Sequence, residues 1–262
     1  MKTIPITYAG QTISLPDLPD YRKFYRKLES GAWEPETFNV LRRNLDRDTV
    51  YVDIGAWIGV TPFWASALAR RVIAFEPDPA CFAILQSLVF RYDNVSVTQA
   101  ALSPAPEVTI HAVEGFGSSE TSILDIGEGE SLDVPGIGMD AIMRQAGAAR
   151  SFVKIDIEGY EFACAAEIAR LRNHDVCGVQ LAVHPQLLEK SLTGIGLWRR
   201  LKVAWAVWRL GGIFKGLFPP PRLAKYDGVA GYVIWGVLLR ATPRGADFVF
   251  ERQAPRRRGK DG

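Results

Sequence analysis

Short apolar runs alternate along the chain with longer segments in which apolar residues recur at helical spacing. This alternation predicts an α/β domain. Most of the runs are apolar on both faces, which is typical of strands in a mostly parallel sheet flanked by helices. The expected strands lie at residues 50–54, 71–75, 95–101, 108–113, 152–157, 179–183 and 248–252, and the expected helices at 61–70 and 79–92, with a further helix ending at Gly147.

Residues 1–48 show a different pattern and are expected to form a small N-terminal cap. Alternating residues at 3–14 predict a hairpin. Apolar residues recur at i, i+3, i+4 and i+7 from position 21 to 28, which predicts an amphipathic helix, and a second helix is expected over 35–45. The cap offers no chemistry that the sequence identifies, so we expect it to cover an edge of the sheet.

The regular alternation stops at 191–246, where a helical insertion is expected. Its main helix has one apolar face and one basic face. We expect the apolar face to pack into the core beneath the sheet. The alternative is a helix over 197–217 that lies on a membrane surface or meets a lipid-linked substrate. The apolar face comprises Leu197, Trp198, Leu201, Trp205 and Trp208, and the basic face Arg199, Lys202 and Arg209.

Composition limits the function only broadly. A chain of 262 residues can bury one substantial core, which we assign to residues 49–252, and residues 253–262 form a basic tail. The net charge of +2 indicates no nucleic-acid partner. The three cysteines lack metal-ligand spacing and sit among apolar neighbours, so buried free thiols are expected. Without a leader-like N-terminus or a long apolar run, we expect a cytoplasmic protein.

The stretch Asp53-Ile-Gly-Ala-Trp-Ile-Gly59 holds the first candidate site. It follows an apolar strand, and its glycines allow a sharp turn into the helix that begins near Thr61. Strand, turn and helix together form a small-ligand site at the carboxyl edge of a sheet. Because Asp53 brings a negative charge, an ammonium or a hydroxyl suits this site better than a phosphate.

Glu76 is the second candidate. It ends the next strand, 17 residues after Gly59, near the spacing at which an acid in a nucleotide-binding βαβ unit accepts from ribose hydroxyls. Residues 100–103, at the end of the following strand, are expected near the adenine of such a ligand. The glycine-rich loop 115–123 is either a substrate lid or an ordinary surface loop.

The third candidate is Lys154-Ile-Asp-Ile-Glu158. Residues two apart share one face of a strand, so Lys154, Asp156 and Glu158 are expected to point the same way, into a cleft. The alternatives are an internal Lys–Asp pair that only orders the sheet edge, and Glu158 as the cap of a following helix. His184 ends the strand expected beside Asp156 and is equally balanced between a structural and a catalytic role. No role is assigned to His111 or His174.

Together these motifs resemble the FkbM family of S-adenosylmethionine-dependent methyltransferases over about residues 48–190. The resemblance rests on Asp53-Ile-Gly-Ala-Trp-Ile-Gly59, Ala74-Phe-Glu-Pro-Asp-Pro79, Ala101-Leu-Ser103, Val153-Lys-Ile-Asp-Ile-Glu-Gly159 and Val183-His-Pro185. It implies a Rossmann-like class I methyltransferase fold with a mostly parallel, seven-stranded sheet. It also implies O-methylation of a hydroxyl on a sugar, glycan, glycolipid or glycosylated natural product.

The resemblance assigns roles to the candidate residues. The cofactor is S-adenosylmethionine, with Asp53 at its methionine end, Glu76 at its ribose, and Asp156 between cofactor and acceptor. Asp156 and His184, with Glu158 third, are the candidates for a general base, or alternatively for ligands of a divalent cation such as magnesium. The remaining cofactor contacts would come from Gly55, Ala56, Gly59, Pro77 and Ala101.

Three features depart from the family pattern: Trp57 replaces a frequent Asn, Ala182 replaces a frequent acid before His-Pro, and segment 191–246 is long and rich in tryptophan. They motivate an alternative, a non-catalytic protein at a membrane surface or on a glycolipid that retains the fold. That protein would lie at the inner membrane face. A nicotinamide oxidoreductase is disfavoured, because the G-x-G-x-x-G fingerprint is absent. A homo-oligomer is compatible with every hypothesis.

Overall fold

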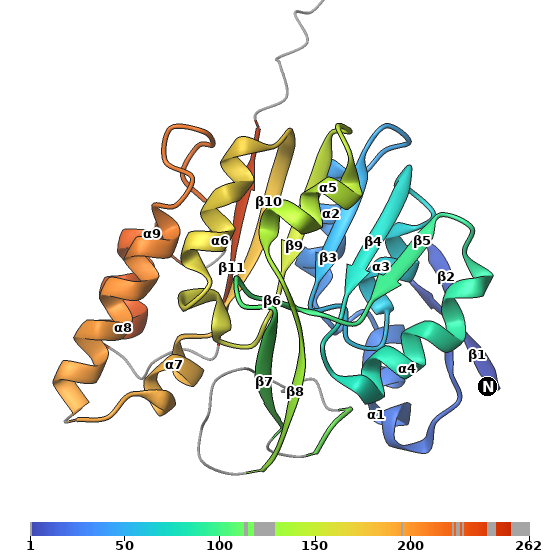
Figure 1. Ribbon diagram of the computed structural model, residues 1–262, viewed down its shortest axis with the longest axis horizontal. Coiled ribbons are helices and arrows are strands. Elements are labelled where there is room, and N and C mark those ends of the chain that lie inside the picture. Colours follow the sequence, from blue (N-terminus) through green and yellow to red (C-terminus); the bar gives the residue numbers. More distant parts are fainter. Residues whose placement is uncertain are drawn as a thin grey trace, which may run out of the picture.

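A six-stranded sheet forms the centre of the molecule (Figure 1). The computed structural model describes residues 2–112, 115–117, 129–194, 196–221, 223, 226, 228–239 and 245–252. The strand order is β11-β10-β9-β3-β4-β5, and all neighbours are parallel except β10 and β11. The strands are β3 (Val50–Ile54), β4 (Arg71–Phe75), β5 (Val95–Thr98), β9 (Ser151–Ile155), β10 (Val176–Val183) and β11 (Ala246–Glu251).

The α/β fold and the mostly parallel sheet are therefore confirmed, but the count of seven strands is wrong for the described residues. The long segment before β11 supplies no strand to the sheet within its described parts. It forms helices instead: α7 (Pro185–Ser191), α8 (Gly196–Gly211), α9 (Gly228–Gly231) and the π-helix η5 (Tyr232–Leu238). β11 consequently pairs directly with β10 at the edge of the sheet.

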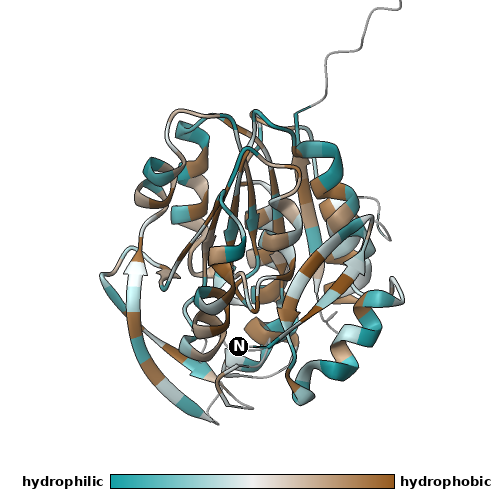
Figure 2. Ribbon diagram, turned by 90° about the vertical axis from the view of Figure 1, so that its right-hand side faces the viewer, coloured by the Kyte–Doolittle hydropathy of each residue, from teal (hydrophilic) through white to brown (hydrophobic). Residues whose placement is uncertain are grey.

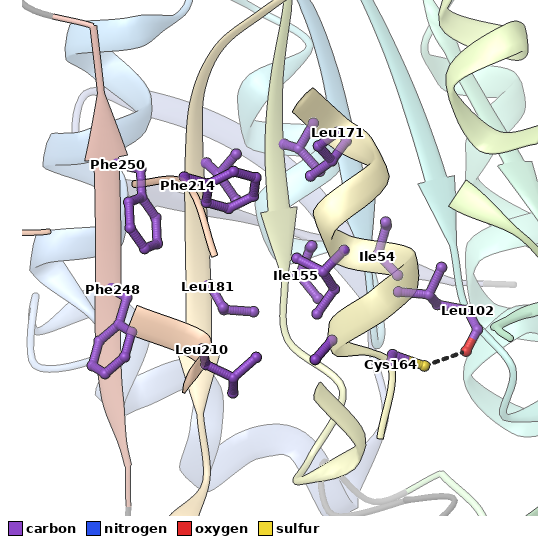
Figure 3. Packing of buried hydrophobic residues seen from close by; sticks show 14 of the residues in the cluster. Ile54, Leu102, Ile155, Cys164, Leu171, Leu181, Leu210, Phe214, Phe248 and Phe250 are labelled. Carbon is purple, nitrogen blue, oxygen red and sulfur yellow. Dashed lines mark hydrogen bonds between the residues drawn. The ribbon is translucent and has the colours of Figure 1, made fainter. Parts of the chain in front are cut away.

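Alternating side chains of each central strand enter two separate apolar layers. In β3, Val50, Val52 and Ile54 face one layer, and Tyr51 faces the other. The first layer, part of which Figure 3 shows, packs against α5 (Met139–Ala146), α6 (Ala165–Ala169), α8 and η5. The second packs against the N-terminal elements, α3 (Val60–Ala65) and α4 (Pro79–Leu88). Apolar residues accordingly colour the strands between the helices in Figure 2.

The N-terminal elements predicted from the pattern are present. β1 (Thr3–Tyr8) and β2 (Gln11–Pro16) form the hairpin, and α1 (Arg22–Glu29) and α2 (Pro35–Asn44) follow. The short 3-10 helix η1 (Pro19–Tyr21) precedes α1, and others occur at η2 (Val89–Arg91), η3 (Tyr160–Phe162) and η4 (Arg170–Asn173). All three cysteines are buried free thiols, as predicted.

The strand expected over 95–101 is divided. β5 ends at Thr98, and β6 (Ala101–Leu102) joins a second sheet with β8 (Glu130–Ile137) and β7 (Glu107–Ala112), in the order β6-β8-β7. The chain leaves the central sheet between these strands, so the end of the predicted strand belongs to a different layer. Most of loop 115–123 and the basic tail 253–262 lie outside the described residues.

The expected burial of the apolar face of α8 is wrong. Its large residues are exposed, and the buried stripe consists of Val203, Ala204, Val207 and Leu210. Both sides of this helix carry apolar residues, and the smaller, branched ones fit against the sheet layer. No helix in the described parts of the chain is long and apolar enough to cross a membrane.

Candidate functional site

The glycine turn after β3 needs both of its glycines. Gly55 has φ +87°, and a Cβ there would lie 1.8 Å from the backbone oxygen of Asp156. Gly59, with φ +93°, is the N-cap residue of α3, and a Cβ there would lie 2.3 Å from the ring of Phe63. Trp57 between them also has a positive φ, +48°. The turn therefore brings the end of β3 against the end of β9 with no room for a side chain.

Glu76 closes this turn from the end of β4. Its carboxylate accepts hydrogen bonds from the backbone N–H of Trp57 at 2.7 Å and of Asp78 at 2.9 Å. Burial raises the pKa of Glu76 to about 8. Asp78 caps α4 through the N–H groups of Ala80 and Cys81. An acid is thus fixed beside the glycine turn, as the spacing of these motifs predicted.

A cavity of about 570 Å³ opens at this carboxyl edge of the sheet. Two predicted cofactor residues do not line it. Gly59 lies within the turn, and Asp53 is fully buried beneath, with one carboxylate oxygen accepting from the Thr61 hydroxyl at 2.6 Å. Asp53 therefore acts on the site through its neighbours. The predicted residues that do line the cavity are Gly55, Ala56, Glu76, Pro77, Ala101, Asp156 and Glu158.

The N-terminal cap forms one wall of this cavity, which the sequence analysis missed. Tyr21, Phe24 and Trp33 line it together with Trp57 from the glycine turn. Their rings contact one another: the ring centroids of Phe24 and Trp57 are 4.7 Å apart, and those of Phe24 and Trp33 are 5.3 Å apart. The cap thus does more than cover an edge of the sheet. Only the aromatic content of residues 21–33 could have signalled this.

Glu34 belongs to the same wall and was also missed. It precedes α2 with a left-handed backbone, φ +42° and ψ +48°, and its carboxylate accepts from the Thr37 hydroxyl at 3.2 Å. Burial, reinforced by the charges of Asp156 and Asp247, raises the pKa of Glu34 to about 7, although Lys154 opposes the shift. In the sequence, an acid before Pro35 resembles an ordinary helix start.

Lys154 connects the acids at the centre of the site. Its ammonium nitrogen lies 2.9 Å from Asp156 Oδ2 and 3.9 Å from Asp53 Oδ1, and its side chain is nearly fully buried. Burial lowers the pKa of a lysine, but the two carboxylates outweigh it here and raise the pKa. The internal Lys–Asp pair considered as an alternative exists. It lines the cavity as well, so both interpretations of this strand end hold for its geometry.

His184 lies next to the two acids predicted to accompany it, although it does not itself line the cavity. Its Nε2 is 3.7 Å from Asp156 Oδ1 and 3.6 Å from Glu158 Oε2. A third acid, Glu161, was missed. Fully buried, it lies 3.5 Å from His184 Nδ1 and accepts hydrogen bonds from the N–H groups of His184 and Gly159. Glu161, not Glu158, therefore satisfies the backbone where η3 begins.

The charge state of His184 follows from these neighbours. Burial lowers its pKa, but the hydrogen-bonding Glu161 carboxylate and the charges of Glu158 and Asp156 outweigh burial and raise the pKa to about 10. The imidazole is then protonated at neutral pH and has no free lone pair to accept a substrate proton. Burial raises the pKa of Asp156, but Lys154 and His184 prevail and lower it, so this carboxylate is ionised.

The same three residues could hold a divalent cation. One ligand atom each from Asp156, Glu158 and His184 lies within 4.8 Å of the others. Asp156 Oδ1 and His184 Nδ1 are buried and have no hydrogen-bond partner among the described residues. Two carboxylates and an imidazole suit manganese, iron or zinc better than magnesium, which prefers oxygen ligands. A cation here requires His184 in its neutral form.

A parallel sheet with a glycine turn, a buried acid after the second strand and charged residues after the fourth defines a Rossmann-like domain that binds a small ligand at its carboxyl edge. The chain belongs to a family of S-adenosylmethionine-dependent methyltransferases: the model of the methyltransferase FkbM domain matches residues 53–196, more than half of the chain. The family predicted from the motifs is thereby confirmed.

Solved structures with a similar arrangement are distant in sequence. The putative methyltransferase yhhF from Escherichia coli has a TM-score of 0.46 and 11% identity, covering 97% of this chain and 100% of its own. The putative methyltransferase SMU.1697c from Streptococcus mutans, in complex with SAH, has a TM-score of 0.44 and 14% identity, covering 83% and 96%. Among the curated proteins, none matches the chain.

Proposed function

We propose that this protein transfers a methyl group from S-adenosylmethionine to a hydroxyl of a sugar, glycan, glycolipid or glycosylated natural product. One observation carries the proposal: a single cavity runs from the glycine turn and Glu76 to Asp156 and Glu158. A cofactor site and a set of acid–base groups therefore open into the same space.

The chemistry of the cavity supports this cofactor. Glu76 offers a carboxylate to the two ribose hydroxyls, and it can accept from both. Gly55 and Ala56 leave backbone space for the methionine part, while Ala101 and Leu102 offer an apolar surface to the adenine. The ammonium and the sulfonium of adenosylmethionine suit a site that holds the acids Asp156 and Glu158. When bound, the cofactor supplies an electrophilic methyl group.

The aromatic wall supports a sugar acceptor. Tyr21, Phe24 and Trp33 present rings to the cavity, and the apolar C–H face of a pyranose can pack on such rings. Lys23, Lys27 and Glu34 line the same wall and can bond sugar hydroxyls. A flat, hydroxyl-rich acceptor uses both kinds of contact. Trp57, where the family often has Asn, adds a ring to this wall.

The acceptor hydroxyl must lose its proton as it attacks the methyl group in line. Asp156 and Glu158 are the acids that face the cavity, and we assign the proton to one of them. His184 is protonated in this network, so it acts as a positioning residue that holds both carboxylates. This changes the role expected for His184 from its sequence position. Alignment of the acceptor oxygen with the methyl group supplies much of the remaining acceleration.

The alternative use of these residues is to hold a divalent cation that polarises the acceptor hydroxyl. The two uses differ in the charge of His184, which is positive in the ion-pair network and neutral as a ligand. We therefore propose to dialyse the protein against EDTA and measure methyl transfer with and without Mn²⁺, Zn²⁺ or Mg²⁺. Activity that survives chelation supports the ion-pair network, and activity restored only by a metal supports the cation.

Methyl transfer is tested with radiolabelled S-adenosylmethionine and a panel of glycans and glycolipids, comparing wild type with Asp156→Asn and with Glu107→Gln. Glu107 is an exposed acid on β7 outside the cavity. We expect label in an alkali-stable ether on the sugar, loss of about 10²-fold or more in Asp156→Asn, and no change in Glu107→Gln. Label on an amine or a carboxyl group would refute O-methylation and leave methyl transfer standing.

A further inference from the structure

Helix α8 and the π-helix η5 expose an unusual number of large apolar side chains. Trp198 is 63% exposed, Trp205 65% and Trp235 58%. The two helices pack against each other, with the Arg200 guanidinium donating to the backbone oxygen of Leu238 at 3.5 Å. We call the following residues the Trp surface: Leu197, Trp198, Leu201, Trp205, Trp208, Ile234, Trp235 and Leu239.

The Trp surface is the outer side of a helix whose inner side is already used. At 100° per residue, the five residues of α8 in this surface span about 100° of arc, and the buried stripe that includes Val203 and Val207 lies opposite. Figure 1 shows α8 at the flank of the molecule away from the β1–β2 hairpin. The core therefore gains nothing from these tryptophans, and an external partner is needed to cover them.

The charges around the Trp surface identify the partner. Residues 190–226 contain eight lysines and arginines and no aspartate or glutamate. On α8, Lys202 and Arg209 flank the apolar arc and are exposed, and the Arg209 guanidinium lies 5.6 Å from the centre of the Trp205 ring. Exposed tryptophans beside basic residues match the boundary between anionic headgroups and acyl chains, where indole rings are favoured.

Two other occupants fit the charges less well. A second copy of the chain, docked by a twofold axis on this surface, would bring its basic residues against those of the first, because such an interface pairs a patch with itself. A membrane-crossing mode has no helix to support it within the described residues. Attachment in the plane of the bilayer remains.

We propose that the Trp surface docks the protein onto an anionic lipid bilayer, with α8 lying in the interface. The tryptophans insert at the level of the headgroups, and Lys202 and Arg209 contact lipid phosphates. A protein docked in this way can reach a lipid-linked acceptor, although the docking itself does not depend on methyl transfer. It accounts for the long, tryptophan-rich segment that the family pattern left unexplained.

The test is sedimentation of the full chain with vesicles of phosphatidylcholine alone and with 30% phosphatidylglycerol, a fraction chosen to be about that of a strongly anionic membrane. We expect binding to the anionic vesicles, a blue shift of tryptophan emission, and weakening as salt rises from about 0.05 to 0.5 M. Each basic contact contributes about fivefold to the partition coefficient, so Lys202→Glu/Arg209→Glu should lose about 25-fold or more.

Matched variants separate docking from folding and from oligomer formation. Trp198→Ala/Trp205→Ala should lose vesicle binding, while Phe90→Ala, at an equally exposed apolar residue outside the Trp surface, should retain it. Circular dichroism and adenosylmethionine titration report whether each variant is folded. Equal binding to neutral and anionic vesicles, or no binding by the folded wild type, would overturn the proposal. So would a wild-type dimer that Trp198→Ala/Trp205→Ala converts to a monomer.

Discussion

Lys154 holds two carboxylates together in the interior, so its replacement by methionine should expose the cost of this arrangement. Methionine keeps the length of the side chain and removes the charge. Asp53, which is not exposed at all, then loses the cation that lies 3.9 Å away, and Asp156 loses the one at 2.9 Å. The two acids would also repel each other without a positive charge between them.

The magnitude follows from these distances. With an effective dielectric constant of about 20, Coulomb's law gives about 6 kcal/mol for the 2.9 Å pair and about 4 kcal/mol for the 3.9 Å pair. Desolvation of the three groups offsets much of this sum. Measured losses on removing one partner of a buried pair are about 3–5 kcal/mol, and we expect a value in this range for Lys154→Met. A domain has about 5–15 kcal/mol in total.

Urea unfolding followed by circular dichroism measures this loss, with the exposed lysine variant Lys190→Met as a control expected within about 0.5 kcal/mol of wild type. The double variant Lys154→Met/Asp156→Asn should regain about 1–2 kcal/mol relative to Lys154→Met, because it removes one of the two uncompensated charges. A loss below about 1 kcal/mol in Lys154→Met, or no recovery in the double variant, would refute the argument.

Three further variants test separate parts of the site. Gly55→Ala should lose about 3 kcal/mol or more in urea unfolding, because its Cβ meets the Asp156 backbone oxygen at 1.8 Å and its φ is +87°; a neutral effect would contradict the tight turn. His184 has a folded pKa of about 10, above the unfolded value of about 6.5, so its protonation stabilises the fold fully below pH 6.5 and this contribution disappears as the pH rises through 10. His184→Gln should lack that pH dependence, on the order of 2–4 kcal/mol, while His111→Gln keeps it. Glu34→Gln should flatten the part of the pH–rate profile near pH 7, since that carboxyl titrates at about 7, and an unchanged profile would show that its ionisation plays no part.

The sequence allowed much of the fold and part of the site to be predicted because both follow from local order. Gly55, Glu76 and Asp156 each follow an apolar run, and the carboxyl ends of parallel strands meet at one edge. Knowing the strands therefore brings these residues together without knowledge of the packing. The alternation of apolar and polar positions similarly predicted β1, β2, α1 and α2.

The remaining features depend on contacts between distant parts of the chain. Glu34 and Tyr21 enter the cavity only because the cap folds over the edge of the sheet, and no spacing relative to Asp156 indicates this. The function of Glu161 depends on the position of His184, on a different strand. In α8, residues on both sides are apolar, so periodicity alone could not decide between the stripe containing Val203 and the Trp surface.

Calorimetric titration with S-adenosylmethionine tests the central claim most directly. We expect saturable binding of one molecule per chain, loss of binding in Glu76→Ala, and wild-type binding in Glu107→Ala, which changes an exposed acid outside the cavity. Because the pKa of Glu76 is raised to about 8, binding by the wild type should strengthen as the pH rises from 7 to 9. A folded wild-type protein that binds no adenosylmethionine, or a Glu76→Ala variant that binds it as wild type does, would contradict the account.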